Sequence, residues 1–164
     1  DPAETIPPMA TVIGVDPGKS GGLVALSSDT GKVLDQLRMP LVRGTRVLDH
    51  RAIYDFMRRV QPDVVAQEYA SSRPENGVKQ AFEFGRAVEA PRAAAAILRI
   101  RVVDVMPKAW QALVVGLDKG DAMKSSIVAA ARRLWPELSL DLKADWGRAD
   151  AAFIARYYCQ EKLS

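Results

Sequence analysis

The chain has 164 residues, of which 48% are hydrophobic and 26% charged, as is typical of a globular domain with a sizeable core. The single cysteine, Cys159, excludes a disulfide framework within the chain, and the single histidine, His50, argues further against a Cys/His zinc site. The net charge of +3 permits a polyanionic partner without requiring one. No apolar run approaches the roughly 20 residues of a membrane helix, so no membrane partner is expected.

The first quarter of the chain predicts a short lead and a β-meander. Residues 1–10 are acidic and proline-rich and are expected to be disordered, with a single domain following over 11–164. Three apolar runs separated by turn residues predict strands at 12–15, 22–26 and 32–40. Since these strands follow one another through short turns, they are expected to pair in hairpin order.

The middle of the chain alternates helix and strand. Apolar residues at helical spacing predict a helix over 49–60 with Asp49 as its N-cap. The short apolar run at 63–69 then reads as a buried strand parallel to the first. A second helix is expected over 77–98, with a kink or break at Pro91.

The last third predicts one more parallel strand and then helices. The strand is expected at 100–107, and a helix begins at its closing proline. Two further helices are expected over 120–136 and 148–163. The whole order predicts an α/β fold with a five-stranded mixed sheet flanked by helices.

The stretch VIGVDPGKSGG at 12–22 has three interpretations. Gly18, Lys19 and Ser20 resemble the end of a P-loop, although the glycine spacing is one residue short and no helix pattern follows. The stretch could instead be a strand that carries a metal-binding carboxylate, Asp16. It could also be an ordinary hairpin with a solvated acid.

Four acids suggest a shared site. Glu68 ends a run that reads as a central strand, where glutamate is almost never buried unless it is paired or metal-bound. If that strand lies parallel to the first, Asp16 and Glu68 leave the sheet at similar heights. Asp145 is expected just before the last helix and Asp150 one turn inside it, where each could also serve only as a helix cap. Clustered together, four carboxylates would repel one another and need a cation.

Four segments, taken together, resemble the RuvC family of Holliday junction resolvases. They are residues 12–26, 64–89, 102–116 and 143–158, in the family's order and spacing. The resemblance is closest to the RuvC-like proteins of phages and the monokaryotic-chloroplast resolvase of plants and algae. An acid followed by x-G-R-A and a second acid is the most specific motif for those two branches.

The resemblance implies an RNase H-like fold and a homodimeric endonuclease that nicks four-way DNA junctions in pairs and leaves 5′-phosphate ends. It implies two Mg²⁺ or Mn²⁺ ions per active site and no small-molecule cofactor. Asp16, Glu68, Asp145 and Asp150 would be the metal ligands, and the amide variant of each is expected to bind junctions without cutting them. Lys124 would stabilise charge at the scissile phosphate.

The same resemblance suggests residues that contact DNA, alongside the simpler reading that they are solvated surface cations. These residues are Arg73, Asn76, Lys79, Lys119, Lys124 and Arg148. The chain departs from the family at Gln111, where members often carry lysine, and this departure is the argument for one alternative, a non-catalytic nucleic-acid-binding module of the same fold. A ribonuclease H-type nuclease is the other alternative that stays open.

Overall fold

The computed structural model describes residues 9–71, 77–114 and 121–163, with no account of the side chains of 121, 162 and 163. The strands are β1 (Thr11–Asp16), β2 (Gly22–Ser27), β3 (Val33–Arg38), β4 (Val64–Glu68) and β5 (Arg101–Val105). The helices are α1 (His50–Val60), α2 (Val78–Ile97), α3 (Pro107–Gln111), α4 (Asp121–Leu134) and α5 (Gly147–Leu163), with a 3₁₀ turn, η1 (Lys143–Asp145), before the last. The expected disordered lead falls almost wholly on residues 1–8, outside the described residues.

The five strands form one mixed sheet in the order β3-β2-β1-β4-β5. β1, β2 and β3 pair antiparallel, and β4 and β5 join them in parallel. This is the α/β arrangement that the sequence predicts, and it places the first strand at the centre. The carboxyl ends of β1, β4 and β5 therefore meet at one edge.

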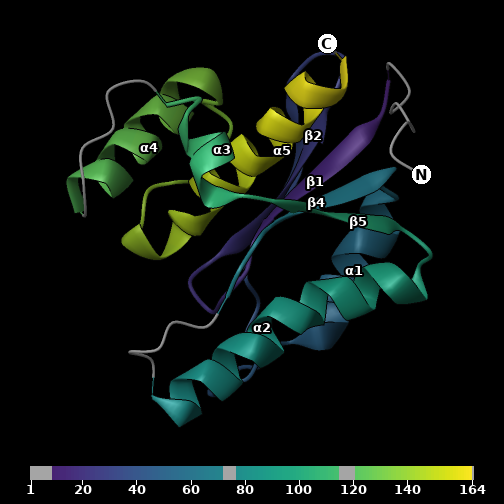
Figure 1. Ribbon diagram of the computed structural model, residues 1–164, viewed down its shortest axis with the longest axis vertical. Coiled ribbons are helices and arrows are strands. Elements are labelled where there is room, and N and C mark those ends of the chain that lie inside the picture. The colour runs from purple at the N-terminus through teal and green to yellow at the C-terminus, as the bar shows by residue number, and fades with distance from the viewer. Residues whose placement is uncertain (1–8, 72–76, 115–120, 164) are drawn as a thin grey trace.

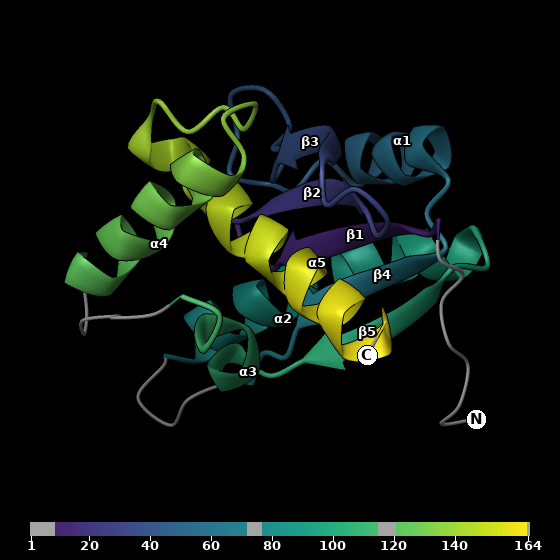
Figure 2. The same cartoon turned by 90° about the horizontal axis from the view of Figure 1, so that it is seen from above.

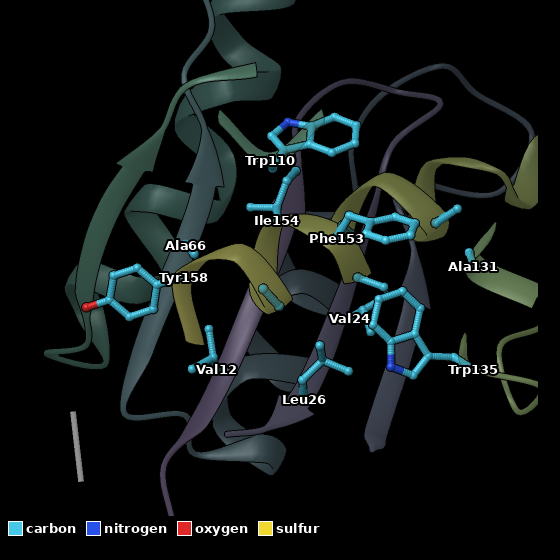
Figure 3. Packing of buried hydrophobic residues seen from close by; sticks show 14 of the residues in the cluster. Val12, Val24, Leu26, Ala66, Trp110, Ala131, Trp135, Phe153, Ile154 and Tyr158 are labelled. Carbon is cyan, nitrogen blue, oxygen red and sulfur yellow. The ribbon is translucent and has the colours of Figure 1, made fainter. Parts of the chain in front are cut away.

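Helices cover both faces of the sheet, and two clusters of buried side chains fill the layers between them (Figure 1). α1 and α2 pack on one face. α5 runs across β1, β2 and β4 on the other, with α3 and α4 beside it (Figure 2). The α5 cluster includes Val12, Phe153 and Ile154, together with the indoles of Trp110 and Trp135 (Figure 3).

Local signals explain most helix boundaries. Asp49 Oδ1 accepts the backbone N–H of Ala52 at 3.0 Å, which confirms the predicted N-cap of α1. Of the kink or break expected at Pro91, the break is wrong, because α2 continues through it. Pro91 is buried, and Ala87, Ala90 and Ala94 of the same helix belong to the core cluster on this face of the sheet. Tertiary packing of this kind supplies most of the stability of a helix, which offsets the missing backbone donor. None of the described helices is long and apolar enough to cross a membrane.

Candidate active site

The glycine-rich stretch after Asp16 is the turn of a β-hairpin. β2 follows it directly, and the N–H of Gly21 bonds to the carbonyl of Gly18 at 3.1 Å. Gly18 has a φ of 117°, a conformation that favours glycine. The P-loop interpretation is wrong, because no helix N-terminus follows to cradle a phosphate. Gly21 also pairs with Gly147, so this turn touches the start of α5.

Asp16 and Glu68 end neighbouring parallel strands. The register pairs Val15 with Gln67, so the next residue of each strand leaves the sheet beside the other. Because side chains alternate along a strand, both acids point to the face that α5 covers. Gln67 points to the opposite face, where its amide donates to the carbonyl of Val88 at 2.9 Å.

Asp150 and Lys124 complete a cluster at this edge. Asp150 lies in the first turn of α5 and is 8% exposed. Lys124, on α4, donates to Asp150 Oδ2. The other oxygen, Oδ1, is buried and has no hydrogen-bond partner among the described residues. We call Asp16, Glu68, Asp150 and Lys124 the acidic cluster.

Burial and neighbouring charges shift the pKa values of the three acids in the acidic cluster. Burial raises the pKa of Asp16 well above its usual range, Asp150 and Glu68 raise it further, and Lys124 opposes them. Burial also raises the pKa of Glu68 and that of Asp150. Raised carboxyl pKa values of this kind are common at functional sites, and a bound cation would favour the ionised forms.

The structure does not bring Asp145 into the acidic cluster. Arg38 Nε donates to Asp145 Oδ1 at 2.8 Å, and a terminal nitrogen of Arg148 lies 2.9 Å from the same oxygen. Oδ2 accepts the backbone N–H of Leu142 at 3.3 Å. Burial alone would raise the pKa of Asp145, but these partners outweigh it and lower that pKa. In this structure Asp145 is therefore bonded to Arg38 and Arg148, and its role as a fourth metal ligand stays a prediction.

We expect Asp145→Asn to distinguish a role of Asp145 in ion pairing from a role as a metal ligand. The amide leaves Arg148 and half-exposed Arg38 without their carboxylate, so the free energy of unfolding should fall by about 2–3 kcal/mol. Mn²⁺ affinity, measured by calorimetry, should stay at the wild-type value. Asp150→Asn is the matched variant, and it should lose metal affinity. If Asp145→Asn lost as much Mn²⁺ affinity as Asp150→Asn, Asp145 would be a metal ligand.

Only part of the predicted DNA surface lies in the described residues. Three of its members lie outside them: Arg73, Asn76 and Lys119. Lys79 is exposed in the first turn of α2. Arg148 is almost buried, and it donates to the carbonyl of Ser139 as well as to Asp145. Its guanidinium is therefore engaged within the protein, and its contact with DNA stays a prediction.

Two residues at the site were not identified from the sequence. Trp110 Nε1 donates to Glu68 Oε2 at 2.6 Å. Arg38 ends β3 opposite Gly22 and holds Asp145. The only sequence signal for Arg38 was its place at the end of a strand. The only sequence signal for Trp110 was that a tryptophan follows shortly after β5, the strand that pairs with β4 and its last residue, Glu68.

The described residues contain no group of three or more His, Cys, Asp or Glu side chains placed to hold a metal ion as they stand. Asp16, Glu68 and Asp150 are near enough to shift one another's pKa but do not form a ready-made ligand cage. Metal binding at the acidic cluster therefore stays a prediction.

Solved structures share this arrangement of strands and helices. Thermus thermophilus RuvC in complex with a Holliday junction substrate matches with a TM-score of 0.70 and 20% identity, over 93% of this chain and 96% of that chain. The chain has the fold of RuvC. Another Thermus thermophilus RuvC structure matches with a TM-score of 0.65 and 22% identity, over 92% of this chain and 96% of that one.

The yeast mitochondrial Holliday junction resolvase Ydc2 is similar to a lesser degree. Its TM-score is 0.57 at 16% identity, over 96% of this chain and 81% of that chain. No protein-family model matches the chain, and no curated protein matches its sequence. The predicted α/β class is confirmed, with a mixed five-stranded sheet between helices, and this architecture is shared with RuvC.

Proposed function

We propose that this protein is a Holliday junction resolvase, a metal-dependent endonuclease that makes paired nicks in four-way DNA junctions. The observation that carries the proposal is the acidic cluster, which brings Asp16, Glu68 and Asp150 together with Lys124 at one edge of a RuvC fold. The match to a RuvC bound to a Holliday junction substrate supports the choice of DNA as substrate.

The three acids of the acidic cluster suit Mg²⁺ or Mn²⁺. Their possible ligand atoms are all carboxylate oxygens, which hard cations prefer. Asp150 Oδ1 is buried without a partner among the described residues, and burial, followed by the charges of Asp150 and Glu68, raises the pKa of Asp16. Bound cations would supply an activated water and stabilise the leaving oxygen, and we propose two per site.

Each residue of the cluster has a distinct task in this proposal. Asp16, at the end of the central strand β1, where the charges of both other acids act on it, would be the shared ligand, with Glu68 and Asp150 as the further ligands. Lys124 would stabilise negative charge on the phosphate that is attacked. Because Lys124 already bonds to Asp150 Oδ2, the ammonium group and a metal ion compete for that carboxylate.

A hollow with three basic side chains lies against the β1–β2 turn that follows Asp16. It is lined by Gly18 of that turn, by Lys19, Arg46 and Lys79, and by Gln80, Glu83, Phe84 and Ala87. Its volume is about 470 Å³. Lys19 is partly neutralised by Glu83, whose carboxylate it contacts at 2.9 Å. We propose that the remaining positive charge, on Arg46 and Lys79, attracts the phosphate backbone of DNA.

We also propose a homodimer, since two equivalent strands of a junction call for two equivalent active sites. The proposed interface includes α2, where the apolar side chains of Val78 and Phe82 are 89% and 68% exposed. Light scattering should give twice the chain mass for the wild type and the mass of one chain for Phe82→Glu. A wild-type protein that stays monomeric at micromolar concentration, with and without junction DNA, would contradict this part of the proposal.

A cleavage assay tests the proposed function. Labelled four-way junction, linear duplex and RNA–DNA hybrid are each incubated with the protein, with and without Mg²⁺. Paired nicks in the junction alone, only with the metal, are the expected result. Cleavage of the hybrid alone would assign a ribonuclease H activity instead. Junction binding without cleavage in Mg²⁺ or Mn²⁺ would indicate a binding module.

A further inference from the structure

Trp110 lies beside the acidic cluster because of how β5 ends. β5 pairs in parallel with β4, and its last residue, Val105, is opposite Glu68. Pro107 then starts α3 at once, since proline suits the first position of a helix. Trp110 follows within this single turn, so its indole returns over the carboxyl end of β4.

The indole is both part of the core and a hydrogen-bond donor to the cluster. Trp110 is 2% exposed and packs in the same cluster as Ile154 of α5 (Figure 3). Its only polar atom, Nε1, donates to Glu68 Oε2 at 2.6 Å. A ring packed on all sides cannot turn freely, so its N–H group is a fixed donor.

We propose that Trp110 is a positioning residue, which holds the carboxylate of Glu68 in the orientation that binds the metal. The inference rests on the proposed function, because it assumes that Glu68 is a ligand. Carboxylates that bind metals are in turn held by neighbouring donors, and loss of such a donor typically weakens binding about 10–100-fold. The side chain of Glu68, which is not fully buried, has several rotamers to lose without that donor.

A purely structural role would be to pack the core and satisfy a buried N–H group. Trp135 shows what that role looks like in the same protein. It is also 2% exposed in the same core cluster, and its Nε1 donates at 2.8 Å to a backbone carbonyl, that of Gly31. Its acceptor is thus not a member of the acidic cluster, so Trp135 is a matched control.

The test compares Trp110→Phe with Trp135→Phe. Both substitutions keep an aromatic ring and remove one N–H donor, so both should lower the melting temperature to a similar degree. Mn²⁺ affinity without DNA, measured by electron paramagnetic resonance, should fall about 10–100-fold in Trp110→Phe and stay unchanged in Trp135→Phe. The Mg²⁺ concentration for half-maximal junction cleavage should rise by the same factor in Trp110→Phe alone.

A second measurement needs no folded Trp110 variant. In the ¹⁵N-labelled wild type, the indole N–H resonance of Trp110 should shift when Mg²⁺ is added, while that of Trp135 should not. Equal Mn²⁺ affinities in the two variants, or an unmoved Trp110 resonance in a wild type that binds metal, would overturn the inference and leave the proposed function standing. A wild type that neither binds metal nor cuts junctions would overturn both.

Discussion

Asp16→Asn should abolish junction cleavage and at the same time raise the melting temperature of the protein in EDTA. Cleavage should be lost because the proposed shared metal ligand loses its charge. Stability should rise because burial of the Asp16 carboxyl, and then the charges of Asp150 and Glu68, oppose its ionisation. Removing this cost should raise the melting temperature by a few degrees, since a chain of this size gains about 2–4 °C for each kcal/mol.

The stabilisation that Asp16→Asn brings should increase as the pH rises. A carboxyl whose pKa is raised in the folded protein keeps its proton there over a pH range in which the unfolded chain has released it. Wild-type stability contributed by Asp16 therefore falls as the pH rises through that range. The difference in melting temperature between Asp16→Asn and wild type should widen from about pH 4 upward.

Asp63→Asn is the control for this experiment. Asp63 lies at the opposite end of β1, where its Oδ2 accepts the backbone N–H of Thr11 at 2.8 Å. Its carboxylate is exposed and favourably bonded, so the amide should not raise the melting temperature and should leave cleavage intact. An Asp16→Asn protein that cuts junctions, or that melts below the wild type in EDTA, would contradict the role assigned to Asp16.

Gly14→Ala adds one methyl group to β1, and it should lower the stability of the protein more than a methyl group added elsewhere on that strand. A Cβ at Gly14 would stand 1.9 Å from the carbonyl oxygen of Ala151 and 2.7 Å from the backbone nitrogen of Ala155. These are main-chain atoms of α5, which cannot rotate away as a side chain would. We expect a loss of about 3 kcal/mol or more, at the upper end of the cost of overpacking.

The same substitution should weaken the site. α5 carries Asp150 and β1 carries Asp16, so moving the helix away from the strand separates the two acids. Mn²⁺ affinity should therefore fall in any Gly14→Ala protein that remains folded. Gly85→Ala is the control, because a Cβ at this exposed position of α2 meets no atom within 4 Å. That change should stabilise the helix by up to about 1 kcal/mol. Equal melting temperatures for the two variants would contradict this account of the β1–α5 contact.

Much of this fold could be predicted from the sequence because its elements have strong local patterns. The five apolar runs bounded by turn residues are strands, and Asp49 caps α1 as predicted. The break expected at Pro91 was wrong because tertiary packing overrides the local preference of a proline. Local sequence does not reveal that Pro91 is buried.

The candidate site was predicted less completely. Asp16 and Glu68 could be grouped because parallel strands end at the same edge. The position of Asp145 before the last helix was also predicted, but its partner Arg38 is 107 residues away in the chain. The bond between Trp110 and Glu68 depends on the register of β4 and β5, which no local pattern specifies.

Gly21 and Gly147 make the spacing of the acids tolerant of change elsewhere in the protein. A Cβ on Gly147 would stand 2.3 Å from the carbonyl oxygen of Ser20, so bare main chain meets bare main chain there. At this contact, main-chain atoms set the separation between the segment after Asp16 and the segment before Asp150. Core substitutions away from the β1–α5 contact can then alter stability while leaving the acids in place.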